Sequence, residues 1–128
     1  MKNIVITGGA GGIGKCIREE FEKAGAKVCI IDIADNPYFV GDIGDEATLR
    51  RFAEKVIAEY GRVDCLINNA PPLFKGINEC TYEEFNYALR VGVSAAFLLT
   101  QLFLPYFAPG PASSIYPRWV AAFPISRR

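Results

Sequence analysis

The sequence of 128 residues contains no histidine. Because imidazole is the usual base of serine triads and a common metal ligand, its absence excludes histidine-dependent triads and histidine-containing metal sites. Net charge is absent too, since 14 Lys and Arg balance 14 Asp and Glu. A chain with no basic excess lacks the electrostatic footprint of a nucleic-acid binder, so we expect no nucleic-acid partner and no metal.

Paired cysteines and long apolar runs are also missing. Cys16, Cys29, Cys65 and Cys80 stand singly, and no Cys-x-x-Cys occurs. This spacing predicts that the thiols are reduced and that some of them lie in the core. We therefore expect a cytoplasmic protein. The N-terminal apolar run is too short for a signal peptide, and the run at 91–103 falls short of the roughly 20 residues that span a bilayer. We therefore expect no membrane segment.

The residues that are present predict one globular domain, since 51% are hydrophobic and 22% are charged. Apolar runs at 2–7, 26–32, 38–40 and 62–70 predict strands. Helical spacing of apolar residues, with capping signals at Asp45 and Thr81, predicts helices at 12–24, 46–60 and 82–103. Continuous apolar strands alternating with helices indicate an α/β fold. We predict an incomplete Rossmann-like parallel sheet of about four strands, with helices on both faces.

The last part of the chain departs from this pattern. Five prolines fall within residues 104–128, and no regular period is visible there. We predict a dinucleotide-binding domain at 1–107 and an irregular, proline-rich tail at 108–128. Such a tail is poorly suited to cover the open edge of the fourth strand.

Residues 7–14, "TGGAGGIG", hold five glycines directly after the first strand. A strand, a glycine-rich turn and a helix N-terminus form an anion site, because free backbone N–H groups and the helix dipole point at the ligand. Gly9, Gly14 and Lys15 match most of a P-loop, but Cys16 stands where that motif needs a Ser or Thr to hold magnesium. The pattern favours a dinucleotide over a nucleoside triphosphate.

Asp32 ends the second strand, at the distance from the glycines where dinucleotide-binding folds place an acidic residue. Its carboxylate is suited to accept hydrogen bonds from the ribose hydroxyls and would repel a 2′-phosphate. No arginine flanks it. The sequence therefore predicts NAD as the cofactor, preferred over NADP.

Three motifs together resemble the short-chain dehydrogenase/reductase family over about residues 1–107. They are the Thr-Gly-x-x-x-Gly-x-Gly pattern at 7–14, the acidic step at 42–43 and Asn-Asn-Ala at 68–70. The resemblance implies hydride transfer between a nicotinamide and a small alcohol or carbonyl compound, and a dimer formed through the helix at 82–103. The cofactor-binding residues that it implies, with Asp32, are Thr7, Gly8, Gly12, Ile13, Gly14, Asp42, Ile43, Asn68, Asn69 and Ala70.

Purely structural roles are open for several of these residues. Thr7 is also suited to tie the glycine turn to the fourth strand. For Asp42, the role of a loop carboxylate or of a helix cap is the less favoured alternative. Asn68 and Asn69 have side chains that could satisfy strand-end backbone groups without touching a ligand. The apolar face of the helix at 82–103 fits a core or a subunit interface.

The catalytic residues of the resembling family are not found. That family uses a Tyr with a Lys four residues later, a Ser on the fifth strand and an Asn on the long helix. No Tyr-x-x-x-Lys occurs, and Gly92 stands at the Asn position. Ser113 and Ser114 lie in surroundings unlike the fifth strand, and Pro71 replaces a usual glycine. We assign no catalytic residue and expect the chain to be inactive on its own.

Codon degeneracy around residues 113–119 permits a shifted reading of the encoding DNA that spells the family's fifth strand. We hypothesise a lost reading frame near Ala112; the alternative is a short relative with a divergent end. Three functional classes follow: the cofactor-binding part of an oxidoreductase, a non-catalytic NAD-binding module, or an interaction protein that uses the apolar helix.

Overall fold

The computed structural model describes residues 1–72, 75–109, 114–117 and 123–124. Its elements follow the predicted order of strands and helices. They are β1 (Asn3–Thr7), α1 (Gly12–Lys23), β2 (Lys27–Asp32), β3 (Phe39–Val40), α2 (Glu46–Tyr60), β4 (Cys65–Asn68), α3 (Tyr82–Leu89), a π turn (Arg90–Ser94), α4 (Ala95–Phe103), a 3₁₀ turn (Leu104–Tyr106), β5 (Ser114–Pro117) and β6 (Phe123–Pro124).

The described strands form one sheet in the order β3-β2-β1-β4-β5-β6. The pairs from β3 to β5 are parallel, and β6 is antiparallel to β5. The parallel Rossmann-like fold is therefore confirmed. Because the chain order reverses between β1 and β4, the sheet has a topological switch point there, where ligands of such folds bind.

The structure differs from our expectation at the end of the chain. Residues 114–117, which we expected to be irregular, pair in parallel with β4, with Ile115 opposite Leu66. This segment covers the edge of β4 that we expected to stay open. The edge of β4 offers unpaired backbone groups to this segment, and Ile115 and Tyr116 are residues that favour strands.

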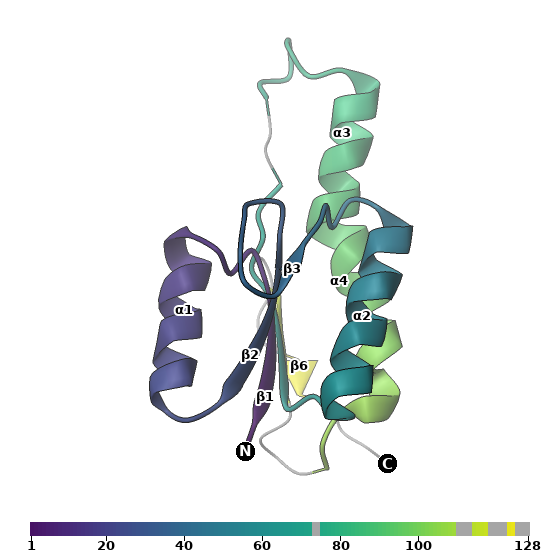
Figure 1. The fold of residues 1–128 in the computed structure, drawn as a ribbon. Coiled ribbons are helices and arrows are strands. Elements are labelled where there is room, and N and C mark those ends of the chain that lie inside the picture. The colour runs from purple at the N-terminus through teal and green to yellow at the C-terminus, as the bar shows by residue number, and fades with distance from the viewer. Residues whose placement is uncertain (73–74, 110–113, 118–122, 125–128) are drawn as a thin grey trace.

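Figure 1 shows the layers: α1 lies on one face of the sheet, and α2 and α4 lie on the other. The predicted bounds of the helix at 46–60 and the predicted cap at Thr81 are confirmed. The Asp45 side chain accepts a hydrogen bond from the Thr48 N–H at 3.1 Å, and Gly61 closes α2 with φ of 67°. The Thr81 hydroxyl caps α3 by accepting from the Glu84 N–H at 3.1 Å.

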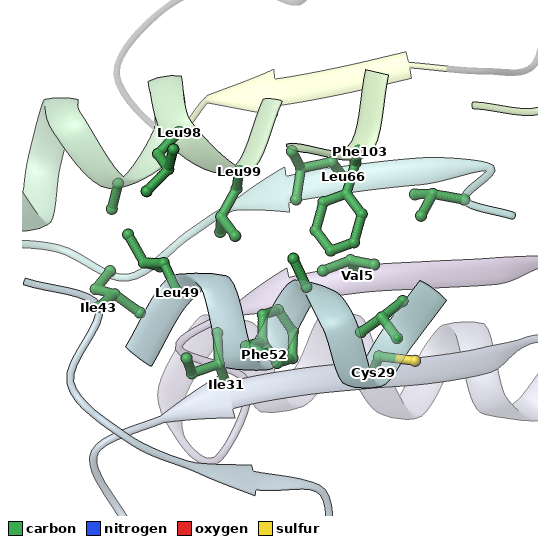
Figure 2. Close-up of a cluster of buried hydrophobic side chains, with 14 of the residues drawn as sticks. Val5, Cys29, Ile31, Ile43, Leu49, Phe52, Leu66, Leu98, Leu99 and Phe103 are labelled. Atoms are coloured by element: carbon green, nitrogen blue, oxygen red, sulfur yellow. The ribbon is translucent and has the colours of Figure 1, made fainter. Parts of the chain in front are cut away.

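The larger part of the core lies between the sheet and the α2–α4 layer (Figure 2). Val5 and Leu66 from the central strands pack there against Leu99 of α4, and all three are fully buried. Phe52 of α2 meets Phe103 of α4 edge to face, with ring centroids 6.3 Å apart. This packing holds the carboxyl ends of β1 and β4 in register, and those ends form the floor of the site.

The predicted helix at 82–103 is longer than expected. A helical segment with a π turn inside it runs over Tyr82–Tyr106, 25 residues, and is long and apolar enough to cross a membrane by length and composition. Our argument that the apolar run was too short for such a span is therefore wrong. In the fold, Leu98, Leu99 and Phe103 of this segment pack against the core.

Candidate dinucleotide site

A cavity of about 640 Å³ opens at the carboxyl ends of β1, β2 and β4. Among the described residues that line it there are two carboxylates and no lysine or arginine. The residues are Gly8, Ala10, Gly11, Gly12, Ile13, Ile31, Asp32, Ile33, Ala34, Gly41, Asp42, Ile43, Asn69, Ala70, Pro71, Tyr87 and Val91.

The glycine turn brings β1 and α1 into close contact. Gly8 has a positive φ of 72°, and a Cβ on Gly14 would lie 2.0 Å from the Gly8 carbonyl oxygen. Only glycine fits at position 14, because the first turn of α1 rests on this carbonyl. A Cβ on Gly11 or Gly12 would instead meet nothing within 4 Å. The backbone at these two positions therefore faces open space in the cavity.

Helix α1 starts beside this space without any compensation of its dipole. Its N-cap, Gly11, offers no side-chain hydrogen bond, and the first turn contains no acidic residue. Unsatisfied N–H groups and the positive end of the dipole favour an anion at such a helix start. This part of the cavity fits the pyrophosphate of a dinucleotide.

Thr7 and Asn69 join the ends of β1 and β4. The Thr7 hydroxyl accepts hydrogen bonds from the backbone N–H groups of Asn69 at 3.0 Å and Ala70 at 3.1 Å. The Asn69 amide in turn donates to the Gly8 carbonyl at 3.1 Å. The structural role that we left open for Thr7 and Asn69 is present: these side chains hold the glycine turn in place. Asn69 also lines the cavity.

Asp32 lies at the end of β2, and backbone N–H groups hold its carboxylate. Oδ2 accepts from Ala10 in the glycine turn, and Oδ1 accepts from Ala34, both at 3.0 Å. The Asp32 side chain is therefore oriented by both loops at the mouth of the cavity. Each oxygen keeps lone pairs with which to accept a further hydrogen bond from a ligand hydroxyl.

Asp42 and Ile43 follow β3 and reach the same cavity. Asp42 is not the cap of α2, which is Asp45; it accepts instead from the Gly44 N–H at 2.8 Å. Its second partner is Tyr87 of α3, whose hydroxyl lies 2.8 Å from both carboxylate oxygens. Desolvation and the hydrogen bond to Asp42 raise the pKa of the Tyr87 phenol, so it stays a donor.

Tyr87 is the one lining residue with a polar side chain that our sequence analysis missed among the described residues. It stands 45 residues after Asp42 on a different element, so no local pattern connects the two. Val91, one turn further along, lines the cavity as well. The helical spacing of these two residues indicates a shared face but does not indicate which surface that face meets.

The predicted cofactor-binding residues fall into two groups, those that line the cavity and those that do not. Eight of the predicted residues line it, whereas Thr7, Gly14 and Asn68 do not. Both polar side-chain atoms of Asn68 are buried without a hydrogen-bond partner among the described residues. Lys15, which a P-loop would aim at a phosphate, does not line the cavity and lies 3.9 Å from Glu19.

The side of the site that follows β4 departs from the pattern of the resembling family. Gly92 lies in the π turn, where a Cβ would come within 3.1 Å of Pro72 Cγ. Pro72 therefore occupies the space into which a side chain at position 92 would project. Ser114 starts β5 opposite Cys65, while Ser113 and Ala112 lie outside the described residues.

Comparison with known proteins establishes the family. The family model described as "short chain dehydrogenase" matches residues 2–115, past residue 107, where we expected the resemblance to end. The chain belongs to the short-chain dehydrogenase/reductase family of oxidoreductases. Proteins of this family bind nicotinamide dinucleotide cofactors and small-molecule substrates.

Among curated proteins, the chain is similar to momilactone A synthase of Oryza sativa subsp. japonica, with 34% identity over 89% of this chain and 48% of that protein. It is also similar to L-fucose dehydrogenase of Bos taurus, with 29% identity over 82% of this chain and 44% of that protein. The chain thus spans about half the length of the curated relatives that it matches.

Solved structures agree. An apo SCOR enzyme from Clostridium thermocellum superimposes with a TM-score of 0.77 and 39% identity, over 82% of this chain and 49% of that one. A metagenomic short-chain oxidoreductase in complex with NADP superimposes with a TM-score of 0.75 and 25% identity, over 82% of this chain and 55% of that one. The family is therefore the same by sequence and by fold.

Proposed function

We propose that this chain is the NAD(H)-binding part of a short-chain oxidoreductase. The observation that carries the proposal is the cavity at the switch point, lined by the glycine turn, by Asp32 and Asp42, and by no described lysine or arginine. When bound, the nicotinamide accepts or supplies a hydride at the carbon of an alcohol or carbonyl compound.

The residues of this chain bind and orient the dinucleotide. The N–H groups at the start of α1 hold the pyrophosphate, with Gly11 and Gly12 leaving room for it. Asp32 accepts from the ribose hydroxyls, and Asp42 and Ile43 line the adenine end. The glycine turn is held in place by Thr7, Gly14 and Asn69. Ala70 lines the cavity wall after β4. Asn68 carries the buried amide next to that wall.

NAD is preferred over NADP in this proposal, although one structural relative is known in complex with NADP. A 2′-phosphate would lie against the Asp32 carboxylate, and no described cation in the cavity would balance its charge. Asp32→Ala should lower the ratio of NADPH to NADH dissociation constants by about 10-fold or more, because a like-charge contact is removed.

Titration calorimetry with NADH and NADPH measures this ratio. Asp35→Ala is the matched control, since it removes the same charge from an exposed neighbour that does not line the cavity. An unchanged ratio in Asp32→Ala would show that Asp32 does not meet the ribose. Absence of NADH binding by the unaltered chain would overturn the proposed function.

We propose further that the chain does not catalyse hydride transfer on its own. The sequence has no Tyr-x-x-x-Lys, and Gly92 has no side chain to take part in a proton relay. NADH binding without oxidation, in the presence of a panel of carbonyl compounds, is the expected result. Turnover with any of them would overturn this part of the proposal. Binding without turnover is also what a non-catalytic NAD module would show.

The nucleotide sequence of the gene separates those two possibilities. We propose that the reading frame is lost near Ala112. DNA sequencing past codon 128 should then find a shifted open frame that encodes Tyr-x-x-x-Lys. If no such frame exists, the non-catalytic NAD-binding module becomes the better interpretation.

The exposed face of the long helix supports a second proposal, that two copies of this chain associate through it. Phe85, Leu89, Val93 and Phe97 recur every four residues and are 47%, 39%, 62% and 67% exposed. A contiguous apolar stripe of this kind marks an interaction surface. The ion pair of Arg90 with Glu83 lies in the same helical segment and disfavours a membrane as the partner.

Light scattering of the purified chain tests the dimer. Phe97→Glu should give a monomer, whereas Ile77→Glu makes the same kind of replacement at an apolar residue that is 94% exposed and lies before α3, outside the stripe, and should leave the dimer intact. A monomeric unaltered chain would overturn the proposal.

We also propose a cytoplasmic location. Burial raises the pKa of the Cys29 thiol to about 11, and a protonated, buried thiol suits a cysteine that stays reduced.

A further inference from the structure

Tyr87 reaches from α3 to the loop that follows β3 and contacts the one carboxylate at that end of the cavity. Its hydroxyl lies 2.8 Å from Oδ1 and 2.8 Å from Oδ2 of Asp42. Tyr87 and Asp42 both line the cavity. The contact therefore belongs to the wall of the site and joins two elements that are distant in sequence.

The Tyr87 ring is held from two sides. A Cβ on Gly44 would lie 2.6 Å from Tyr87 Cε2, so the ring edge rests directly on this glycine. The Arg90 guanidinium stands 5.6 Å from the ring centroid, and its Nη2 is paired with Glu83 at 3.1 Å. A ring fixed in this way presents its hydroxyl to Asp42 in one orientation, which leaves little freedom to the carboxylate.

The hydrogen bonds determine what Asp42 offers to a ligand. Oδ1 accepts from the Gly44 N–H, and the single hydroxyl hydrogen of Tyr87 is shared between Oδ1 and Oδ2. Oδ2 therefore keeps accepting capacity on a group that has no hydrogen to donate. We propose that Tyr87 is a positioning residue that holds Asp42 as an acceptor for an exocyclic amine, and so selects adenine over 6-oxo purines in the bound dinucleotide.

This inference rests on the proposed dinucleotide site and adds a specificity to it. Adenine carries an amino group at C6, which donates to a carboxylate. Hypoxanthine carries an oxygen there, which accepts and would face the lone pairs of Oδ2. A site that offers an acceptor binds a ligand donor well. It discriminates against a ligand that has an acceptor at the same position, because both polar groups are then left unpaired.

A purely structural tether between α3 and the β3–α2 loop is the competing interpretation. A tether would stabilise the cavity wall and would affect every dinucleotide alike. A positioning role changes the ratio between two dinucleotides that differ only at C6. The affinity ratio, and not the affinity itself, therefore separates the two interpretations.

The test compares NADH with reduced nicotinamide hypoxanthine dinucleotide by titration calorimetry on the full chain. The unaltered chain should bind NADH at least about 10-fold more tightly, a size typical of one charge-assisted hydrogen bond. Tyr87→Phe should reduce this ratio to about 3-fold or less. Tyr82→Phe is the matched control, since Tyr82 lies on the same helix, is 82% exposed and does not line the cavity.

Asp42→Asn provides a second measurement that does not depend on the folding of Tyr87→Phe. Its amide gains a donor, so the preference should shift toward the hypoxanthine dinucleotide by about 10-fold relative to the unaltered chain. An unchanged ratio in both variants, or equal binding of both dinucleotides by the unaltered chain, would overturn the inference while leaving NADH binding intact. Failure of the unaltered chain to bind NADH would overturn the proposed function and the inference with it.

Discussion

The two sides of the cavity differ in how completely their polar groups are paired. On the side of β1, α1 and β2, the Thr7 hydroxyl and both Asp32 oxygens have backbone partners at 3.0 to 3.1 Å. On the side that follows β4, the Asn68 amide is buried with no partner among the described residues, and Pro72 packs on Gly92.

In the function that we propose, cofactor binding and catalysis depend on separate parts of this fold. Binding uses backbone geometry, which the segment from β1 to β2 forms almost by itself. Catalysis needs side chains that several distant elements bring together, and one of those positions is Gly92 here. The proposal therefore separates a binding part, which the residues of this chain supply, from a catalytic part, for which we assign no residue.

The strongest test of the well-paired side is Gly14→Ala. Its Cβ would lie 2.0 Å from the Gly8 carbonyl oxygen and 2.5 Å from Asn69 Nδ2, so the glycine turn must move. We expect a loss of NADH affinity of about 100-fold or more, and a loss of stability of roughly 2–4 kcal/mol. Calorimetry and urea denaturation measure the two effects.

Gly76→Ala is the control for that variant, because a Cβ there would meet nothing within 4 Å and its φ is not positive. It should change neither quantity. Wild-type affinity in Gly14→Ala would show that the turn does not form the floor of the binding site.

Thr7→Val tests the link between β1 and β4. The variant keeps the shape of the side chain but removes the acceptor of the Asn69 and Ala70 N–H groups. Because these donors lose their partner, we expect a loss of about 1–3 kcal/mol in unfolding free energy. Thr100→Val is the comparison: its hydroxyl donates to the Ala96 carbonyl of its own helix, which removes no partner from a backbone N–H group, so the loss should be smaller.

Acid stability tests the opposite end of the sheet, away from the cavity. Asp64 is 5% exposed and accepts from the Asn3 N–H at 2.8 Å. Burial alone would raise the pKa of Asp64, but the bonds from Arg62 and Asn3 and the nearby cations outweigh it and lower the pKa below 3.8. Because the folded pKa is the lower one, the stabilisation is present above about pH 4 and is lost as pH falls through the folded value.

Asp64→Asn should therefore lower stability at pH 7 by about 1–2 kcal/mol and flatten its dependence on pH below about 4. Denaturation curves at several pH values measure this. A variant that keeps the acid dependence of the unaltered chain would place that dependence on other carboxylates.

The smallest expected effect concerns the other side of the cavity. Gly92→Ala gains helix propensity of about 1 kcal/mol, but its Cβ would lie 3.1 Å from Pro72 Cγ, so we expect the two effects nearly to cancel. In the Pro72→Ala background, where the contact is removed, Gly92→Ala should raise the free energy of unfolding by about 0.5–1 kcal/mol more than it does in the unaltered chain. NADH affinity should stay constant in all three variants, because neither residue lines the cavity. Additive stabilities would show that the two residues do not interact.

Local patterns predicted much of this structure. The cap at Asp45, the end of α2 at Gly61 and the glycine turn at the start of α1 are local events, and the structure confirms them. The length of the helical segment Tyr82–Tyr106 and the pairing of residues 114–117 were not predicted. The first depends on a π turn that continues the helix, and the second on an open sheet edge that only the folded chain provides.

The sequence by itself determined the family, the order of strands and helices and the glycine turn, because each depends on residues close together in the chain. Only the tertiary structure decided which of the predicted residues line the cavity and that Tyr87 meets Asp42. It also decided that Asp32 is held by Ala10 and that Pro72 fills the space beside Gly92. These contacts join elements that are distant in sequence, and their geometry follows from how the helices pack on the sheet.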